Sequence, residues 1–587
     1  MIDSMVRNVL QGVTIKEILE SINKKYGNRT ALRIKNEDGS FKEISFVKLG
    51  RRVVSISSVL INLGVRKGDR VAIFSENRPE WVAAYFGIIS CGGAILPLDV
   101  KLSDPEVEFI LNDSRAKCVF VSAKYLAVID RLRNVLPYLS SIILLDRSER
   151  TDVIQLHKLR PHRGKERLRD IYPEDTAIII YTSGTTGVAK GVEISCKNLL
   201  FQVLEFSQII RCTPKERLLS VLPLNHMLEI TGGLIAPLYA GSCVTYCDTL
   251  KTSTLLPLMR ETGTTAIICV PLVLKLIHSG IMKKAAKATP FRQRVFRLAL
   301  WLSRALVGCN IRAGRVFFSS IHREFGGRLH TFISGGAPLD TDVEIDMNAL
   351  GFRVLQGYGL TETAPVISVN TFGQNRVGSV GKPLPGVEVK ILKERDTDAE
   401  GQILTRGPHV MKGYFGNPEK TAEAIRDGWF YTGDLGYFDK DAFLFVTGRK
   451  RNMIVLGSGK KVFPEEVEMV VGKSPYIKEI CVMARTAGRG LRKGYEEVYA
   501  VIVPDMELFG RSGIAAPDAI TSAISSEIAR LGKSLAPYKR IMSFGVSYEE
   551  LPKTATKKIR RDAVSRMAVA TGSNRQPRQG EQKEGPS

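Results

Sequence analysis

The stretch IIIYTSGTTGVAKGVEIS, residues 178–195, reads as an apolar strand, a loop rich in glycine and hydroxyl groups, a lysine and a second strand. Glycines in such a loop let backbone N–H groups converge on an anion. The residues that fit this description are Thr182, Ser183, Gly184, Thr185, Thr186, Gly187 and Lys190. The Walker spacing would require a glycine where Ala189 stands. We therefore predict a phosphate-binding loop of another kind, with a simple Ser/Thr/Gly connection as the alternative.

The rest of the chain indicates an α/β fold. It has 587 residues, 44% of them hydrophobic and 25% charged, as in globular proteins with more than one core. Short apolar runs recur with helix-length segments between many of them, which favours a substantial parallel sheet. These runs are residues 70–74, 94–98, 116–122, 141–145, 176–181, 218–222, 266–270 and 331–334.

Charge and targeting signals limit the classes of partner. The net charge of +24 favours anionic partners, yet the basic residues are not interleaved with an aromatic stacking platform, so we expect no nucleic acid. No apolar run approaches the roughly 20 residues of a spanning helix, and no secretory signal is visible in the first thirty residues. The nine cysteines are scattered without a Cys-x-x-Cys pair, which favours reduced thiols. We expect a cytoplasmic protein.

The segment 283–323 is unusual because it holds ten basic residues and no acidic one. Within it, Phe291, Val295, Leu298, Leu302 and Leu306 fall on one helical stripe, and Arg294, Arg297, Trp301 and Arg304 cluster on another face. Two interpretations stay open. The segment is a packed helix with a solvated basic face, or it is a peripheral contact with the anionic inner face of a membrane.

Two further glycine motifs follow predicted strands, where open α/β sheets bind ligands. In ISGGAPL, residues 333–339, the small residues Gly335, Gly336 and Ala337 leave room for a flat base. In LQGYGLTETAP, residues 355–365, Tyr358 can stack on that base and Glu362 offers a carboxylate to Mg²⁺. The alternative for this second motif is a tight turn capped by Thr and Glu.

The last two motifs lie in the C-terminal third. DGWFYTGDLGYFD, residues 427–439, places Asp434 at a turn suited to two ribose hydroxyls, and Arg449 follows nearby. LPKTATKKIRR, residues 551–561, surrounds a turn with five cations. Taken alone, each motif has a simpler explanation. Asp434 is then an ordinary turn residue, and residues 551–561 are a solvated basic segment.

Together the motifs carry a specific resemblance. YTSGTTG with Lys190, GYGLTET, DGWFYTGD and PKTATKKI occur in the order typical of the AMP-forming superfamily of acyl-CoA synthetases, luciferases and peptide-synthetase adenylation domains. The resemblance covers about Ile15 to Arg566. LPLNHMLE at residues 222–229, VPLVLKLI at 270–277 and the basic insert look most like the long-chain fatty acid–CoA ligases.

The resemblance implies a two-step ligase reaction. A carboxylate, here a fatty acid with a long chain favoured, attacks ATP to give an acyl-adenylate and pyrophosphate, and coenzyme A then displaces AMP. It implies Mg²⁺ as cofactor, with Glu362 and Thr182 as its ligands. Catalytic roles fall to Lys558, Glu362, His226 and Thr182, with Lys558 reaching the carboxylate and the α-phosphate. Nucleotide binding falls to the loop residues named above and to Gly335, Gly336, Ala337, Gln356, Gly357, Tyr358, Gly359, Thr361, Asp434 and Arg449.

The same resemblance implies a large N-terminal domain of mixed parallel sheets flanked by helices, residues 1–450. A small mobile α+β domain, residues 451–566, would rotate about Arg451 between the half-reactions, and residues 567–587 would form a disordered tail. Three residues depart from the family pattern: Ala189, Cys196 and Lys557. None removes a residue with an assigned role, and Ser195 before Cys196 is predicted as a helix N-cap.

Two alternatives stay open. The acyl acceptor is the phosphopantetheine arm of an acyl carrier protein in place of coenzyme A, or the acid is of another class. An amino acid substrate would call for a carboxylate near residues 222–229, where Glu229 is the candidate.

Overall fold

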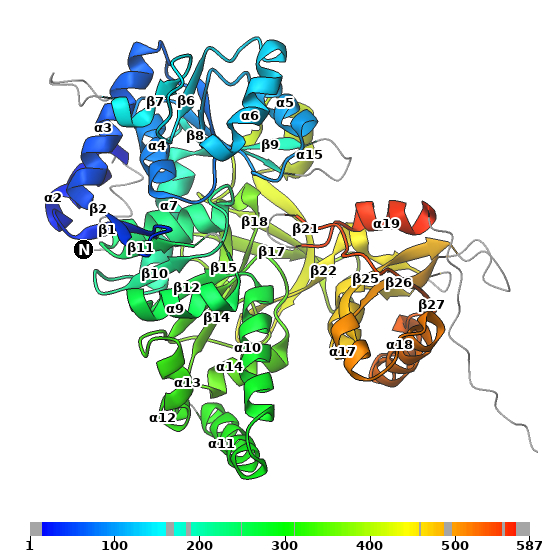
Figure 1. Cartoon of the computed structure of the whole chain (residues 1–587). Coiled ribbons are helices and arrows are strands. Elements are labelled where there is room, and N and C mark those ends of the chain that lie inside the picture. The colour runs from blue at the N-terminus through cyan, green and yellow to red at the C-terminus, as the bar shows by residue number, and fades with distance from the viewer. Residues whose placement is uncertain are drawn as a thin grey trace, which may run out of the picture. The chain divides into compact units, whose positions relative to one another are not determined.

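The computed structural model describes residues 15–159, 169–182, 189–247, 249–309, 311–456, 460–486, 496–554 and 558–570. Contacts divide the chain into two compact units (Figure 1). The first comprises Met1–Lys390, Leu404–Thr432 and Lys440–Leu444, and the second comprises Ile391–Ile403, Gly433–Asp439 and Phe445–Ser587. The boundary expected at residue 450 stays a prediction. The loop residues Ser183, Gly184, Thr185, Thr186 and Gly187, together with Lys557, lie outside the described residues.

A nine-stranded sheet forms one layer of the first unit. Its strands are, in spatial order, β16 (Lys382–Pro383), β15 (Val366–Val369), β14 (Arg353–Gly359), β13 (Thr331–Ser334), β12 (Ala266–Cys269), β10 (Arg217–Ser220), β11 (Cys243–Tyr246), β1 (Thr30–Lys35) and β2 (Phe41–Ser45). The strands from β14 to β1 are parallel, and antiparallel strands complete both edges. Near-continuous apolar strands such as TFIS are buried on both faces, as parallel sheets require.

An eight-stranded sheet forms the other large layer. Its spatial order is β19 (Gly413–Tyr414), β9 (Lys190–Ser195), β8 (Thr176–Thr182), β4 (Ala94–Pro97), β3 (Arg70–Phe74), β5 (Cys118–Val121), β6 (Ser141–Leu144) and β7 (Ile154–Gln155). The strands from β8 to β7 are parallel. Each apolar run predicted from the sequence is a strand, so the α/β prediction is confirmed.

Helices complete the first unit. They are α2 (Ile15–Tyr26), α3 (Phe46–Asn62), α4 (Pro79–Ser90), α5 (Asp104–Asp113), α6 (Ala123–Leu132), α7 (Cys196–Ile209), α8 (Ala236–Tyr239), α9 (Thr252–Thr262), α10 (Pro271–Ala286), α11 (Pro290–Gly308), α12 (Gly314–Phe317), α13 (Ser319–Glu324), α14 (Thr341–Ala349) and α15 (Pro418–Ala424). The predicted N-cap is present, because the Ser195 hydroxyl accepts a hydrogen bond from the Asn198 N–H at 3.1 Å.

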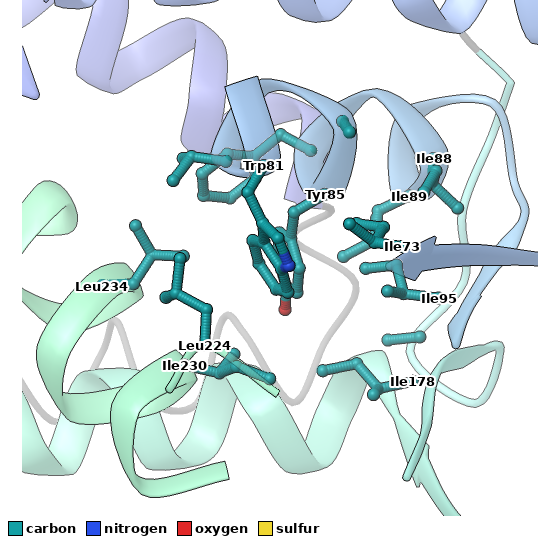
Figure 2. Close-up of a cluster of buried hydrophobic side chains, with 14 of the residues drawn as sticks. Ile73, Trp81, Tyr85, Ile88, Ile89, Ile95, Ile178, Leu224, Ile230 and Leu234 are labelled. Carbon is teal, nitrogen blue, oxygen red and sulfur yellow. The ribbon is translucent and has the colours of Figure 1, made fainter. Parts of the chain in front are cut away.

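The main core joins the eight-stranded sheet to the region around residue 229. Figure 2 shows Trp81 and Tyr85 of α4 in the middle of this core. The sheet contributes Ile73, Ile95 and Ile178, and the segment 224–234 contributes Leu224, Ile230 and Leu234. Ile230 and Leu234 belong to η3 (Glu229–Ile235), a single π-helical turn. π-Helical turns are rare in proteins, and those that occur are often found at functional sites. This core therefore fixes the position of η3.

The second unit is a small α+β fold. It contains a sheet of β25 (Ile477–Thr486), β26 (Glu496–Pro504) and β27 (Ser543–Val546), a short pair β23 (Ile454–Val455) and β24 (Lys461–Val462), and helices α16 (Pro464–Val471), α17 (Met506–Arg511), α18 (Pro517–Gly532) and α19 (Arg561–Ala570). Helix α19 continues to Ala570, and the tail expected from residue 567 stays a prediction. The alanines and methionine at this end favour helix, and Val564 anchors it in the core.

A further sheet is formed by β17 (Glu388–Leu392), β18 (Gly401–Arg406), β21 (Trp429–Phe438) and β20 (Ile425–Arg426), with β22 (Leu444–Arg449) paired to β21.

Among all described residues, no helix combines the length and the apolar composition needed to cross a bilayer.

Candidate active site

The base of the glycine-rich loop is a β-hairpin. Strands β8 and β9 are antiparallel, and Thr182 lies directly opposite Lys190 in the register. Both residues are partly exposed. Residues directly opposite each other in an antiparallel pair project to the same face, so the side chains of Thr182 and Lys190 lie on one face of the strand pair. Two donors placed in this way suit a phosphate group.

Tyr414 links Lys190 to Glu362. Its hydroxyl donates a hydrogen bond to Oε1 of Glu362 at 3.1 Å, and the Lys190 ammonium lies 5.2 Å from the centre of its ring. Burial raises the pKa of Tyr414, and the neighbouring Glu362 raises it further, so the phenol stays a hydrogen-bond donor at neutral pH. Lys190, which is predicted to bind phosphate, and Glu362, which is predicted to bind Mg²⁺, thus both contact Tyr414.

The backbone holds Glu362 from a second side. Glu362 lies in the turn η4 (Thr361–Thr363), which follows β14, and its carbonyl accepts a hydrogen bond from the Met411 N–H at 2.8 Å. The buried Thr363 closes the turn through its hydroxyl, which accepts from the Leu360 N–H at 2.9 Å. The carboxylate is therefore presented from a fixed turn while its side chain stays partly exposed.

Of the predicted glycine positions, Gly335 lies close to the segment 222–229. A Cβ added to Gly335 would stand 3.2 Å from Leu228 and 3.6 Å from the Gly357 carbonyl. A Cβ on Gly359 would overlap the Pro365 carbonyl. A side chain at Gly359 would therefore overlap the backbone, whereas one at Gly335 would press on the Leu228 side chain. His226, two residues before Leu228, is partly exposed.

Glu229 is a fully buried carboxyl group. It sits at the start of η3, where a Cβ on Gly233 would come within 2.4 Å of its carboxyl carbon. Burial raises its pKa to about 8, only partly opposed by Ser220. The group is therefore mostly protonated at neutral pH, and it adds to the raised pKa values of Tyr246 and Cys269 at the ends of the neighbouring strands.

Gln356 has a partner inside the protein. Its amide donates to Oε2 of Glu344 at 2.6 Å, and both side chains are buried. Burial raises the pKa of Glu344 to about 7. The side-chain amide of Gln356 is therefore engaged within the protein, and its nucleotide-binding role stays a prediction. Gly336, Ala337 and Tyr358 are exposed or partly exposed at the neighbouring strand ends.

In the second unit, the predicted ribose residues form an ion pair. The carboxylate of Asp434, which is 3% exposed, lies 2.9 Å from Nε of Arg449. Strands β21 and β22, which are paired, supply these two residues. Arg451 follows in a short turn, where burial lowers its pKa and the nearby Arg449 lowers it further.

Lys558 is an exposed residue of the second unit. Its N–H donates to the Thr554 hydroxyl at 3.1 Å, and its carbonyl accepts from the Thr554 N–H at 2.8 Å. A bridge pairs Lys553 with Ile559. The backbone of Lys558 is thus held on an exposed part of the second unit.

The residues present are compatible with Mg²⁺ held jointly with phosphates. Within the described part of the chain, no cluster of three or more His, Cys, Asp or Glu side chains is placed to hold a metal. Mg²⁺ is usually bound by one or two carboxylates together with substrate phosphates and water. Glu362, which supplies hard oxygen ligands near Lys190 and Thr182, fits this mode.

Comparison with known proteins places the chain in a family. Residues 19–415 match the model of the AMP-binding enzyme family. The chain is 31% identical over 468 residues, 76% of each protein, to the long-chain-fatty-acid–CoA ligase FadD15 of Mycobacterium bovis. It is 28% identical over 549 residues to the indoleacetate–CoA ligase of Aromatoleum aromaticum, covering 92% of this chain and 95% of that protein.

A solved structure shares the fold. The anthranilate CoA ligase AuaEII, in complex with anthranoyl-AMP, superposes with a TM-score of 0.79 at 24% identity, covering 96% of this chain and 98% of that one. The chain therefore belongs to the AMP-binding enzyme family and has the fold of adenylate-forming enzymes, which confirms the resemblance found in the sequence.

Sequence reasoning missed Tyr414. It stands in GYFGN, on the two-residue strand β19 at the edge of the sheet, more than 50 residues from Glu362 and more than 200 from Lys190. No local pattern marks it, because its role depends on β19 pairing with β9.

Proposed function

We propose that the substrate of this adenylate-forming acid–CoA ligase is a long-chain fatty acid. The observation that carries the proposal is the 31% identity over three quarters of the chain to a protein named as a long-chain-fatty-acid–CoA ligase. Related proteins act on other acids, so the acid is the point that needs a test.

The state of Glu229 supports this choice against an amino acid. An ammonium group on the substrate would require an ionised carboxylate facing it. Glu229, the candidate for that role, is fully buried with a pKa of about 8. A mostly neutral, buried carboxyl group suits an acid without a second charge.

In the proposed first half-reaction, an oxygen of the fatty carboxylate attacks the α-phosphorus of ATP, and pyrophosphate leaves. Thr182 and Lys190 hold the β- and γ-phosphates at the base of the loop, with Thr361 assisting. Asp434 and Arg449 fix the ribose, and Gly335–Ala337 with Tyr358 frame the adenine. Mg²⁺, held by Glu362 and Thr182, would neutralise phosphate charge. Such a reaction depends on positioning and charge neutralisation more than on covalent catalysis.

Lys558 neutralises the carboxylate and the α-phosphate in that step. The second unit then turns about Arg451, Lys558 leaves, and the thiol of coenzyme A attacks the acyl carbon. AMP is released and the thioester forms. His226 lies at the junction of acyl group and adenylate.

The test is a product assay on the full chain. Acids from acetate to oleate, with indoleacetate and an amino acid, are incubated with ATP and Mg²⁺, and pyrophosphate and AMP are measured. We expect palmitate or oleate to give the highest kcat/KM, and Lys558→Ala to lower pyrophosphate release by about 100-fold. The exposed Lys533→Ala is the matched control. Preference for acetate or an aryl acid would refute the fatty acid assignment.

The acceptor is tested in the same assay. Coenzyme A and a phosphopantetheinylated acyl carrier protein are supplied separately at equal concentration. We expect acyl-CoA to form faster. Thioester formed only on the carrier protein would replace coenzyme A as the acceptor.

A further inference from the structure

Helix α11 has a second apolar face that the protein does not cover. Five large apolar side chains on this helix are exposed: Phe291 (76%), Val295 (50%), Leu298 (65%), Trp301 (66%) and Leu302 (42%). Their spacing of three to four residues places them on one side of the helix. We call these five residues the exposed stripe.

The packing of α11 does not explain the exposed stripe. The helix packs through another face, on which Leu300 and Ser303 are buried and Phe296 contacts Phe318 edge to face. The Ser303 hydroxyl donates to the Ala349 carbonyl at 2.6 Å on the same side. The apolar stripe predicted from the sequence therefore largely faces solvent. Helix α11 packs through Leu300, Ser303 and Phe296 instead. Exposed apolar patches of this kind mark interaction sites.

Every charged residue of helix α11 itself is an arginine. Arg294 and Arg297 are exposed and lie one helical turn from stripe residues. Of the other basic residues, Arg304 pairs with Asp346 through Nε at 2.7 Å, and Lys284 pairs with Glu324. The segment 283–323 contributes no acidic residue of its own. The surface beside the stripe is therefore strongly positive.

We propose that α11 docks the protein on an anionic lipid membrane, with the exposed stripe entering the interface and Arg294 and Arg297 meeting lipid phosphates. A helix that combines exposed Leu, Phe and Trp with flanking arginines can lie in the plane of a membrane interface. Tryptophan prefers the headgroup level, and each nearby cation strengthens binding to anionic lipid.

A second copy of the chain is a poorer occupant. Two copies brought together through this face would oppose two segments with ten basic residues each and no acidic residue. An anionic bilayer offers both an apolar layer and the neutralising charge. This inference does not depend on which acid the enzyme activates, since it rests only on the surface of α11.

The experiment uses the full chain and sedimented vesicles, either of phosphatidylcholine alone or with about one third phosphatidylglycerol. Leu298→Ser/Trp301→Ser tests the apolar stripe, with Val135→Ser/Tyr138→Ser as the control, because both of those side chains are also exposed. Arg294→Gln/Arg297→Gln tests the charge, with Lys101→Gln/Lys124→Gln as a control of equal net charge. Thermal unfolding checks that each variant is folded.

We expect the wild type to bind the anionic vesicles, and each test variant to lower the partition coefficient by about tenfold. Both controls should stay within about twofold of the wild type. Trp301 is 66% exposed, whereas Trp81 is buried and Trp429, which does not belong to α11, is only partly exposed. Brominated lipid should therefore quench tryptophan fluorescence of the wild type, and Trp301→Phe should lose most of this quenching while still binding.

Three results would overturn the proposal. The test variants could bind as well as the wild type. The lysine control could lose as much binding as the arginine variant, which would indicate an effect of net charge alone. The wild type could ignore vesicles and instead form a dimer that the Leu298→Ser/Trp301→Ser variant abolishes, which would make the stripe an interface between copies.

Discussion

The phenolic hydroxyl of Tyr414 donates a hydrogen bond to the carboxylate of Glu362 across 3.1 Å. The same ring lies under the Lys190 ammonium at 5.2 Å. A residue on an edge strand thus holds two groups that the proposed reaction needs at one phosphate chain. Since hydrogen bonds to charged groups are among the stronger ones, the contact fixes the direction of the carboxylate.

Tyr414→Phe should lower pyrophosphate formation by about tenfold, because it removes a hydrogen bond to a charged group and keeps the ring beneath Lys190. Tyr414→Leu should lower it further, since the cation–π contact is lost as well. Initial rates of pyrophosphate release at varied ATP measure both. The exposed Tyr548→Phe serves as control, and equal rates for Tyr414→Phe and wild type would remove Tyr414 from the site.

Glu362→Gln should raise the Mg²⁺ concentration needed for half-maximal pyrophosphate release by about tenfold, because the amide keeps the shape and loses the charge that a divalent cation requires. A Mg²⁺ titration at saturating ATP gives this value. The exposed Glu419→Gln should leave the titration curve in place. An unshifted curve for Glu362→Gln would mean that the metal is bound elsewhere.

Glu229 should make the protein less stable as the pH rises. Its folded-state pKa of about 8 lies above the ordinary 4.5. Between pH 4.5 and pH 8 the folded protein therefore keeps a proton on Glu229 that the unfolded chain has lost. Its contribution is present in full below about pH 4.5 and declines toward pH 8, with a slope of at most about 1.4 kcal/mol per pH unit.

Urea unfolding of wild type and Glu229→Gln from pH 5 to pH 8 measures this difference. We expect the wild type to lose free energy of unfolding relative to the variant as the pH rises. The contribution of Glu344 cancels because both proteins carry it. The exposed Glu149→Gln should track the wild type, and parallel curves for Glu229→Gln and wild type would contradict the raised pKa.

Asp434→Asn should raise the KM for ATP by about tenfold, because the amide loses the charge that orients Arg449 and a strong acceptor for ribose hydroxyls. Steady-state kinetics at saturating acid give the KM, and urea unfolding separates this effect from instability. The exposed Asp396→Asn is the control within the same unit. A KM equal to that of the wild type would remove Asp434 from the nucleotide site.

The α/β architecture was predictable from the sequence because the apolar runs are short, regular and separated by helix-length segments. Each run, such as residues 331–334, became a buried strand. The pairing of the strands that end at Thr182 and begin at Lys190 was predictable for the same reason, since two apolar runs flank a short glycine-rich segment.

Contacts between distant segments were not predictable in this way. Nothing local reveals that Gln356 is held by Glu344, or that Leu228 lies against Gly335. The helical period of residues 291–306 predicted an amphipathic helix, but it could not tell which face would pack, because that choice depends on the shape of the neighbouring α12 to α14 surface.

The sequence by itself determined the order of strands and helices along the chain and the family to which the chain belongs, because these depend on residue type and spacing. It also supplied the motifs that we predict to bind phosphate, ribose and carboxylate. Only the tertiary structure decided that Tyr414 joins Glu362 to Lys190, that Glu229 is buried and largely protonated, and that the stripe of α11 faces solvent. The physical reason is that pairing, burial and exposure are set by which segments meet in space, and strand pairing brings together residues more than 200 positions apart.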